Sequence, residues 1–370
     1  MKICFMADAI SEHTQKWVNY FAGKGHEVHL ISSRLGEGYI DGVHLYHLTV
    51  PLPQKLWTPL RAINVLTRII KARKLVKRIK PDIINAHYIT ADGFLGAISG
   101  FHPLILTAWG SDILLFSKQS LYWRSLSKYA LNRADMLTCN SGTLRRGLVG
   151  LGVDPAKIRI VYHGIDTQKF KPQTDGEFRA TLGLQGVPVV ISTRKLRPIY
   201  NVEMLIRAIP HILEHVPQAY FIIAGDGDLE EYLEGLATSL GVLEKVRFLG
   251  WVKPVELPNY LASADVYVST SLSDSTSDSL QEAMACELAP VVTDLPANRE
   301  WVTDGKTGYI VPQNDASILA ERVVRLLKNE EIRVKFGREG RKIIRERAEY
   351  EEAMENAEKV YAEVIRTWRS

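Results

Sequence analysis

Short apolar runs alternate with amphipathic stretches along the first half of the chain. A run at 2–7 (KICFMA) is followed by a loop and a helical pattern over 11–25, and then by an alternating run at 26–33 (HEVHLISS). Apolar runs of this length predict strands, and the period of the segment between them predicts a helix. Residues 81–110 repeat the unit, and two more β-rich runs follow at 134–141 and 157–164. Strand–helix–strand units in series favour a parallel sheet covered by helices on both faces.

The second half of the chain starts the same pattern again. The two halves meet near 164–172, where the stretch HGIDTQKFKP (163–172) has turn residues and no apolar period. We therefore predict an α/β protein with two Rossmann-like domains, 1–168 and 169–345, and a C-terminal helix, 346–370, that could pack back on the first domain. Ligands of such folds bind at the carboxyl ends of the strands, so we expect the two domains to face each other across a cleft. Six strands are expected in the second domain: PVVISTR, QAYFIIAGDG, KVRFLGW, ADVYVST, APVVTD and TGYIVP.

The composition is that of an ordinary globular protein, with 46% hydrophobic and 24% charged residues. No apolar run reaches 18 residues and the N-terminus lacks the pattern of a signal peptide, so we expect a cytoplasmic protein without a membrane span. Cys4, Cys139 and Cys286 are far apart in apolar runs, which favours buried free thiols over a disulfide or a metal site.

The charge of the chain is unevenly distributed. Residues 1–168 hold 21 Lys and Arg against 11 Asp and Glu, a net charge of +10, whereas the whole chain carries +4. Much of the excess lies in 61–80, where basic residues alternate with apolar ones as in an amphipathic helix. Such a helix can bind an anionic membrane surface, but it can equally be a domain helix with a solvated basic face. Nucleic acid is a weaker alternative, because no nucleic-acid-binding motif accompanies the charge.

The segment from Asp274 to Val292 (DSTSDSLQEAMACELAPVV) is the most informative part of the chain. It places Asp274 in a loop of small hydroxyl residues, including Thr276 and Ser277, and a second acid, Glu282, eight residues later near a helix start. Such a helix start offers backbone N–H groups to a phosphate, and carboxylates accept hydrogen bonds from sugar hydroxyls. The alternative is a capping box, in which Glu282 reaches back to the backbone of Ser279.

Two other loops follow expected strands of the second domain. Arg194 and Lys195 end one strand and Arg197 follows, an arrangement that suits a pyrophosphate, although a solvated basic loop is the alternative. The turn AGDGDLEEYL has Gly225 and a second glycine, but its acidic side chains would repel a pyrophosphate. A tight-turn role for its glycines is therefore favoured over direct contact.

The first domain offers polar groups at the ends of its expected strands. Trp109 and Asp112 follow the strand LILTA, and His87 ends the strand before it. Asp112 is a candidate for acid–base chemistry or a helix N-cap, and His87 is a candidate site residue or a structural histidine. The first loop adds His13 and Thr14, near a helix N-terminus that can present N–H groups.

Taken together, these motifs resemble those of the retaining family 4 glycosyltransferases, over nearly the whole chain and in the family's order. The departures are Asp274 for Glu, Trp109 for His, Glu287 for Gly, and Ile199 or Tyr200 where a second donor-binding Lys is usual. The paired glycines of the first loop are also replaced.

The resemblance implies a GT-B fold, retention of the anomeric configuration, no metal and no cofactor beyond a nucleotide-sugar co-substrate, with a UDP- or GDP-sugar expected. It implies donor binding by Arg194, Asp274, Thr276, Ser277, Glu282 and Gly225, with Lys195 or Arg197 replacing the missing Lys. Catalytic roles would fall to Arg194, Asp274 and Asp112, and the acceptor side to His13, Thr14, His87 and Trp109. The acceptor would be a hydroxyl compound, lipid-linked or a surface glycan. A nucleotide-sugar epimerase of the same architecture and a non-catalytic nucleotide-sugar-binding protein are the alternatives.

Overall fold

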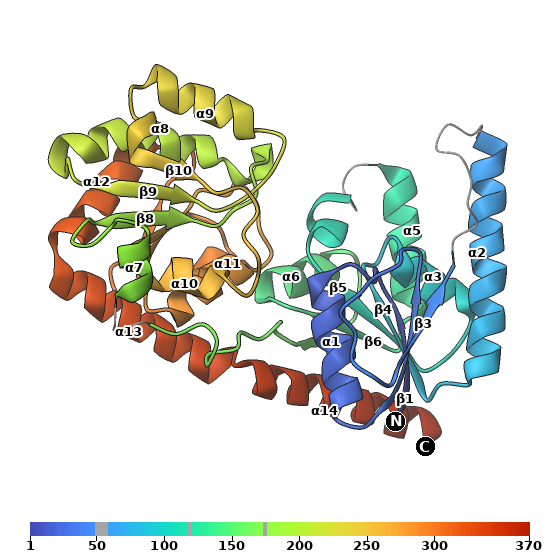
Figure 1. Cartoon of the computed structure of the whole chain (residues 1–370). Coiled ribbons are helices and arrows are strands. Elements are labelled where there is room, and N and C mark those ends of the chain that lie inside the picture. The colour runs from blue at the N-terminus through green and yellow to red at the C-terminus, as the bar shows by residue number, and fades with distance from the viewer. Residues whose placement is uncertain (49–57, 117–119, 173–175) are drawn as a thin grey trace. The chain divides into compact units, whose positions relative to one another are not determined.

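The computed structural model describes residues 1–48, 58–116, 120–172 and 176–370. The chain forms two units, one of Met1–His163 with Ala353–Ser370 and one of Gly164–Glu352 (Figure 1). Each unit is an α/β fold with one parallel sheet and helices on both faces. The change of unit falls at His163 and Gly164, slightly before the predicted boundary at 168, and the chain returns to the first unit at Ala353 rather than at 346.

The first unit contains a parallel sheet in the order β3-β2-β1-β4-β5-β6-β7. Apolar side chains of alternate residues, such as Met6, Ala86 and Leu106, face a core shared with the helices α2, α3, α5 and α6. The strands are β1 Lys2–Met6, β2 Glu27–Ser32, β3 Val43–His47, β4 Ile83–His87, β5 Leu104–Ala108, β6 Met136–Cys139 and β7 Ile158–Ile160, and the helices are α1 Glu12–Gly23, α2 Thr58–Ile79, α3 Asp92–Ser99, η1 Asp112–Phe116, α5 Leu121–Arg133, α6 Gly142–Gly150 and α14 Tyr350–Arg369.

Helix α14 closes the first unit by packing beside α1. The rings of Phe21 and Tyr361 stack with their centroids 4.9 Å apart. At one end of the sheet, the carboxylate of Asp82 accepts hydrogen bonds from the backbone N–H of Lys2, at 2.8 Å, and from the guanidinium of Arg369, at 2.6 Å. The two chain termini therefore lie close together in this unit (Figure 1).

The second unit contains a parallel sheet in the order β10-β9-β8-β11-β12-β13. All six strands expected from the sequence are present, whereas β3 of the first unit was not predicted. The strands are β8 Val189–Ser192, β9 Tyr220–Ile223, β10 Val246–Phe248, β11 Val266–Ser269, β12 Ala289–Thr293 and β13 Tyr309–Val311, and the helices are α7 Glu177–Thr181, α8 Val202–His215, α9 Glu230–Ser239, α10 Leu257–Ala262, α11 Asp278–Ala285, α12 Ala316–Lys328 and α13 Glu330–Arg347, with short 3₁₀ turns between several of them.

The amphipathic pattern of α8 and α12 explains their position in the second unit. Both helices place their buried residues, such as Leu205, Ile209 and Leu319, in one apolar cluster with the strands. This packing fixes the carboxyl edge of the sheet, where the loops after β8 and β11 lie. Among the described residues, no helix has the length and apolar character needed to cross a membrane.

Candidate active site

A buried arginine lies at the carboxyl edge of the second sheet, directly after β8. Arg194 is 8% exposed, and its guanidinium reaches across to the loop that follows β11. One terminal nitrogen donates to the hydroxyls of Ser277, at 2.6 Å, and Ser279, at 2.9 Å. The other donates to the carboxylate of Asp274 at 2.7 Å. The structure thus brings together three residues predicted for the donor site, Arg194, Asp274 and Ser277, over a separation of 80 or more positions in the sequence.

The electrostatics of this pair follow from its burial. Burial raises the pKa of the Asp274 carboxyl, and the positive charge of Arg194 acts in the opposite direction. Burial acts to lower the pKa of Arg194, but Asp274, Tyr267 and Tyr200 together raise it, so the guanidinium stays protonated. A fixed positive charge in a region of low dielectric acts on a nearby anion far more strongly than the same charge in water.

The Nε atom of Arg194 is buried and has no hydrogen-bond partner among the described residues. A buried N–H without a partner costs free energy, so this donor is held in place by the surrounding contacts of Arg194. The guanidinium plane lies over the ring of Tyr200, 4.3 Å from the ring centroid. Tyr200 is one of the two positions, with Ile199, where the resembling family has its second cation, and here it contacts the first cation by a cation–π interaction.

Helix α11 begins at Asp278, and Ser277 is its N-cap, with its hydroxyl accepting the N–H of Leu280 at 3.2 Å. The capping box of Ser279 and Glu282, which we weighed as the alternative, is therefore wrong. The hydroxyl of Ser279 accepts hydrogen bonds from Arg194 and from the hydroxyl of Tyr267, at 2.9 Å. Glu282 lies in the second turn of the helix, half-buried, where it does not cap the first turn.

Two glycines hold the Arg194 loop against its neighbour. A Cβ atom at Gly225 would lie 2.2 Å from the carbonyl oxygen of Arg194, and one at Gly227 would lie 2.3 Å from that of Leu196. The backbone N–H of Leu196 also donates to the carbonyl of Asp226 at 2.8 Å. Gly225 therefore positions Arg194 through backbone packing, which is the tight-turn role favoured by the sequence.

The side chains around this edge divide into buried and exposed ones. Lys195 and Arg197 are exposed, because side chains in this loop are alternately buried and exposed after the buried Arg194. Thr276 is buried, and its hydroxyl accepts from the amide of Gln281, at 2.9 Å, and from the indole N–H of Trp301, at 3.1 Å. Sequence reasoning missed Tyr200, Tyr267, Ser279 and Trp301 as parts of this site. Only Tyr200 carried a signal, because it stands at a departure from the family pattern.

The carboxyl edge of the first sheet carries a different group of side chains. His87 ends β4 and is 3% exposed, and its Nε2 lies 2.6 Å from the amide oxygen of Asn85. The Asn85 amide donates to the hydroxyl of Thr107 at 2.8 Å, which is 2.8 Å from that of Thr138. Burial, and then the charges of the neighbouring histidines, lower the pKa of His87 to about 3. This histidine is neutral at ordinary pH.

Aromatic contacts connect His87 to the other residues predicted for the acceptor side. The ring centroid of Trp109 lies 5.0 Å from that of His87 and 4.8 Å from that of His13, on which it stacks. The ring of His163 lies 4.6 Å from Trp109 and was not predicted. Thr14 is only 2% exposed, so its side chain packs within the unit.

Asp112 is fully buried at the start of η1. Its carboxylate accepts from the backbone N–H groups of Ile89, at 3.0 Å, Gly110, at 2.9 Å, and Ile113, at 3.1 Å, with longer contacts to that of Trp109. Burial raises the pKa of Asp112, and these hydrogen bonds act against the rise. This geometry is that of a residue that holds the loop of Trp109 in place, and the acid–base role of Asp112 stays a prediction.

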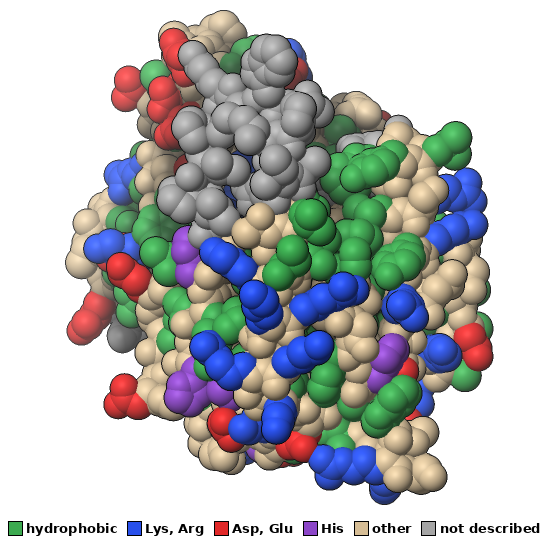
Figure 2. Space-filling view, turned by 90° about the vertical axis from the view of Figure 1, so that its right-hand side faces the viewer, with side chains coloured by type: hydrophobic (Ala, Val, Ile, Leu, Met, Phe, Trp, Pro, Cys, Tyr) green, Lys and Arg blue, Asp and Glu red, His purple; other side chains and the backbone are tan. Residues whose placement is uncertain are grey.

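The basic segment forms part of α2, and its described residues show both expected faces. Ala72, Val76 and Ile79 are buried in the core, as in an ordinary domain helix. Figure 2 shows basic side chains beside exposed hydrophobic ones on this side of the molecule. The exposed residues from 65 onward include Val65, Leu66, Ile70, Lys71, Arg73, Lys74, Lys77, Arg78 and Lys80. The side chains of 61–64 lie outside the described residues.

Comparison with known families identifies the class of protein that this fold and site define. The family model described as glycosyl transferases group 1 matches residues 175–343, and the model described as glycosyl transferase 4-like matches residues 2–141. The chain belongs to this glycosyltransferase family, and its two α/β halves are those of a GT-B glycosyltransferase.

Individual relatives agree with this assignment. The chain is 25% identical to the N-acetyl-alpha-D-glucosaminyl L-malate synthase of Bacillus anthracis, over 93% of this chain and 91% of the relative. It is 31% identical to a GDP-mannose-dependent phosphatidylinositol monomannoside mannosyltransferase of Mycolicibacterium smegmatis, over 57% of both chains. The Anabaena protein HepE, solved in complex with UDP, superposes with a TM-score of 0.83 over 98% of this chain and 100% of that chain, at 19% identity. This last similarity concerns the fold.

Proposed function

We propose that this protein is a retaining, metal-independent glycosyltransferase that moves a hexose from a UDP- or GDP-sugar to the hydroxyl group of a lipid-linked or surface-glycan acceptor. The observation that carries the proposal is the buried Arg194, held by Asp274 and two serine hydroxyls at the carboxyl edge of the second sheet. The relatives' names support it, because one of them uses GDP-mannose, and the HepE structure contains UDP.

The proposed reaction uses the site in the following way. The bond between the sugar's anomeric carbon and the terminal phosphate oxygen breaks, and negative charge grows on the leaving nucleoside diphosphate. The fixed positive charge of Arg194 stabilises that negative charge. The acceptor oxygen bonds to the anomeric carbon on the face that the phosphate leaves, and the hydroxyl proton passes to the departing phosphate. No cofactor and no metal take part.

Glu282 binds the ribose of the nucleotide in this proposal. Its carboxylate projects from the second turn of α11, and the helix start lies next to the Arg194 guanidinium. A charge-assisted hydrogen bond to a ribose hydroxyl would add affinity and direct the phosphates toward Arg194.

A first experiment measures which donor is used. A panel of UDP-, GDP- and ADP-sugars is screened for a rise in melting temperature, because a ligand that binds only the native state stabilises it. Sugar release is then followed by NMR, which also reports the anomeric configuration of the first product. Retention with one nucleotide sugar supports the proposal. An inverted product, or stabilisation without turnover of any sugar, contradicts it and favours a binding protein; a changed sugar still attached to the nucleotide favours an epimerase.

Metal independence needs its own control. His211, Glu214 and His215 on the exposed side of α8 form a cluster whose ligand atoms lie within 4.8 Å of one another, and it could hold an ion. We expect turnover to survive chelation in both the wild type and His211→Ala. Loss of turnover in the chelated wild type, restored by Mg²⁺ or Mn²⁺, would show that a metal takes part.

The lipid-linked acceptor is supported by the surface of α2. Five exposed cations and three exposed apolar side chains lie on its described part, and the exposed Lys80 follows it. Each Lys or Arg near an anionic leaflet contributes about 1 kcal/mol, so four of them give useful reversible binding. We therefore propose that the protein docks on the inner face of the plasma membrane. The phosphatidylinositol monomannoside in the name of one relative agrees with a lipid acceptor.

Vesicle sedimentation tests this docking. We expect binding to anionic but not to neutral vesicles, and a decrease as salt shortens the Debye length. Replacing Lys71, Lys74 and Lys77 with Gln should abolish binding. The matched control replaces three exposed cations of the second unit, Lys328, Lys335 and Arg338. Equal binding to both kinds of vesicle, or equal loss in the control, argues against the proposal.

A further inference from the structure

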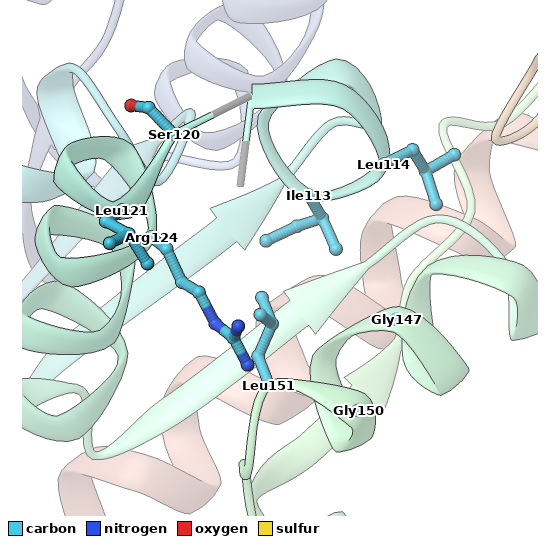
Figure 3. Close-up of a pocket in the computed structure, with 8 residues that line it drawn as sticks. All are labelled: Ile113, Leu114, Ser120, Leu121, Arg124, Gly147, Gly150 and Leu151. Carbon is cyan, nitrogen blue, oxygen red and sulfur yellow. The ribbon is translucent and has the colours of Figure 1, made fainter. Parts of the chain in front are cut away.

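A cavity of about 700 Å³ opens on the first unit, between η1, α5 and α6 (Figure 3). Its volume lies within the range of small-molecule sites. Apolar side chains make most of its wall, contributed by Ile113, Leu114, Leu121 and Leu151. Leu121 is 81% exposed at the mouth of the cavity. The wall is therefore suited to a hydrocarbon group.

One cation lies in this apolar wall. Arg124 projects from α5 toward α6, and in Figure 3 its guanidinium lies beside Leu151. Arg124 is exposed, so its charge remains hydrated when the cavity is empty. An Arg fork binds phosphate oxygens in a bidentate manner, which a purely apolar site does not provide.

Two glycines of α6 shape the cavity differently. A Cβ atom at Gly147 would lie 2.9 Å from the Cγ2 of Ile113, so this glycine allows η1 and α6 to approach each other. A Cβ atom at Gly150, on the same side of the helix one turn later, would meet no atom within 4 Å. The space at Gly150 is therefore part of the cavity itself.

We propose that this cavity binds the hydrocarbon chain of a lipid phosphate, with the phosphate on Arg124. The proposal deepens the proposed function and rests on it, because it assigns the lipid part of the acceptor to a site on the first unit. Two further observations favour this occupant. Leu114 and Ile113 directly follow Asp112, whose carboxylate positions Trp109, so the cavity adjoins the loop that carries the acceptor-side ring. The helix α3 packs against both α5 and the basic helix α2, so the cavity and the proposed membrane-docking helix belong to one face of the unit.

The experiment measures binding of dodecyl phosphate below its micellar concentration by calorimetry, with dodecanol and inorganic phosphate as separate arms. We expect dodecyl phosphate to bind the wild type about ten-fold or more tightly than dodecanol, the scale of a hydrogen bond to a charged group. Inorganic phosphate alone should not bind at this site. Equal affinity for dodecyl phosphate and dodecanol overturns the assignment of the phosphate to Arg124.

Two variants distinguish the contribution of the apolar wall to binding from that of Arg124. Gly150→Phe fills the cavity and should abolish binding of both alkyl probes, whereas Gly235→Phe, on α9 where a Cβ also meets no atom within 4 Å, should not. Arg124→Gln, at an exposed position, should remove the preference for dodecyl phosphate and keep dodecanol binding. Binding of dodecyl phosphate that is unchanged in Gly150→Phe, or in Arg124→Gln, contradicts the proposal.

The melting-temperature shift given by the nucleotide sugar keeps the two proposals distinct. We expect Gly150→Phe and Arg124→Gln to retain the wild-type shift, which reports on the second unit, and an unchanged circular dichroism spectrum shows that the first unit also folds in both variants. If no nucleotide sugar is used by the wild type while dodecyl phosphate still binds as described, the proposed function fails and the cavity remains a lipid-phosphate site. If the donor is used and the alkyl probes do not bind, the cavity proposal fails alone.

Discussion

The two sheets are built alike, and their carboxyl edges carry different chemistry. After β8 and β11 the edge holds a buried ion pair, Arg194 and Asp274, surrounded by hydroxyl groups. After β4 and β5 the edge holds stacked rings, with His87 kept neutral by burial. A parallel sheet therefore provides the location of a site and leaves its chemistry to the loops.

The difference matches a division of the proposed reaction. A nucleoside diphosphate carries several negative charges, and a fixed cation lowers the energy of its departure. The reacting hydroxyl of the acceptor is neutral, and an aromatic surface such as Trp109 binds a sugar ring or a hydrocarbon without adding charge. The following predictions test whether the charged groups of the second unit act on the donor, and whether His87 of the first unit is neutral.

The largest effect is expected at Arg194. Arg194→Ala should reduce kcat by about 100-fold or more, because it removes a preorganised donor from the growing charge of the leaving group. Arg338→Ala, at an exposed position of α13 in the same unit, is the matched control and should change kcat by less than about three-fold, as for a solvent-screened charge. Steady-state kinetics decide the matter. An Arg194→Ala enzyme with raised KM and unchanged kcat would move this residue to ground-state binding.

Glu282→Gln should weaken nucleotide binding by about 1–3 kcal/mol, the scale of a charge-assisted hydrogen bond. Titration calorimetry with the nucleoside diphosphate measures the change directly. Glu234→Gln on the exposed face of α9 makes the same change of charge in the same unit and should leave affinity unaltered. If both variants bind the nucleotide like the wild type, Glu282 does not contact the ribose.

If His87 is neutral in the folded protein, the stability of the protein should depend on pH. His87 has a pKa of about 3 in the folded protein and an ordinary value of 6.5. Between these two pH values His87 is protonated in the unfolded chain and neutral in the folded chain. Its contribution to stability is complete above about pH 6.5 and is lost as the pH falls toward 3. Between pH 6.5 and 5 the loss amounts to about 2 kcal/mol.

Urea unfolding followed across this pH range tests the assignment. In His87→Gln, the decline between pH 6.5 and 5 should be smaller than in the wild type. His215→Gln, which removes an exposed histidine from the second unit, should decline like the wild type. An identical decline in all three proteins would mean that other groups cause it.

Much of the fold could be predicted from sequence periods, because buried parallel strands form continuous apolar runs. Strand β3 was missed since it is an edge strand whose residues Val43–His47 are only partly buried, which weakens the apolar pattern. The sequence only suggested that α14 belongs to the first unit. Its position depends on contacts such as that of Tyr361 with Phe21, which join residues 340 positions apart.

The sequence predicted which residues belong to the site better than it predicted which of them contact one another. The residues Arg194 and Asp274 were each expected to face a ligand, and the structure shows them bound to each other. The alternative that the sequence offered, a capping box of Ser279 and Glu282, is wrong, although Ser277 and Ser279 are both suitable caps. Tertiary contacts decide between them, since Arg194 and Tyr267 both donate to the hydroxyl of Ser279. A local sequence pattern therefore cannot predict which serine caps the helix, because the choice depends on residues far away in the sequence.

The smallest expected effect concerns the end of α11, on which the charged edge depends. Glu287 has a φ of 63°, a left-handed conformation, where the resembling family has glycine. A non-glycine residue in this conformation costs about 1 kcal/mol or more, so Glu287→Gly should raise the free energy of unfolding of the second unit by about 0.5–1 kcal/mol. The contact of its carboxylate with Arg341, at 4.0 Å, is too long to offset this gain.

Glu287→Ala is the control, because it removes the same carboxylate and keeps a Cβ atom in the left-handed conformation. Urea unfolding at constant slope should place Glu287→Gly above the wild type and Glu287→Ala at or below it. Since Gly337 must remain a glycine beside Glu287, where a Cβ would lie 1.9 Å from the Glu287 carbonyl oxygen, the backbone here has little freedom to relax. Equal stability of the two variants would mean that the conformation at Glu287 is not strained, and that the charge alone matters at this helix end.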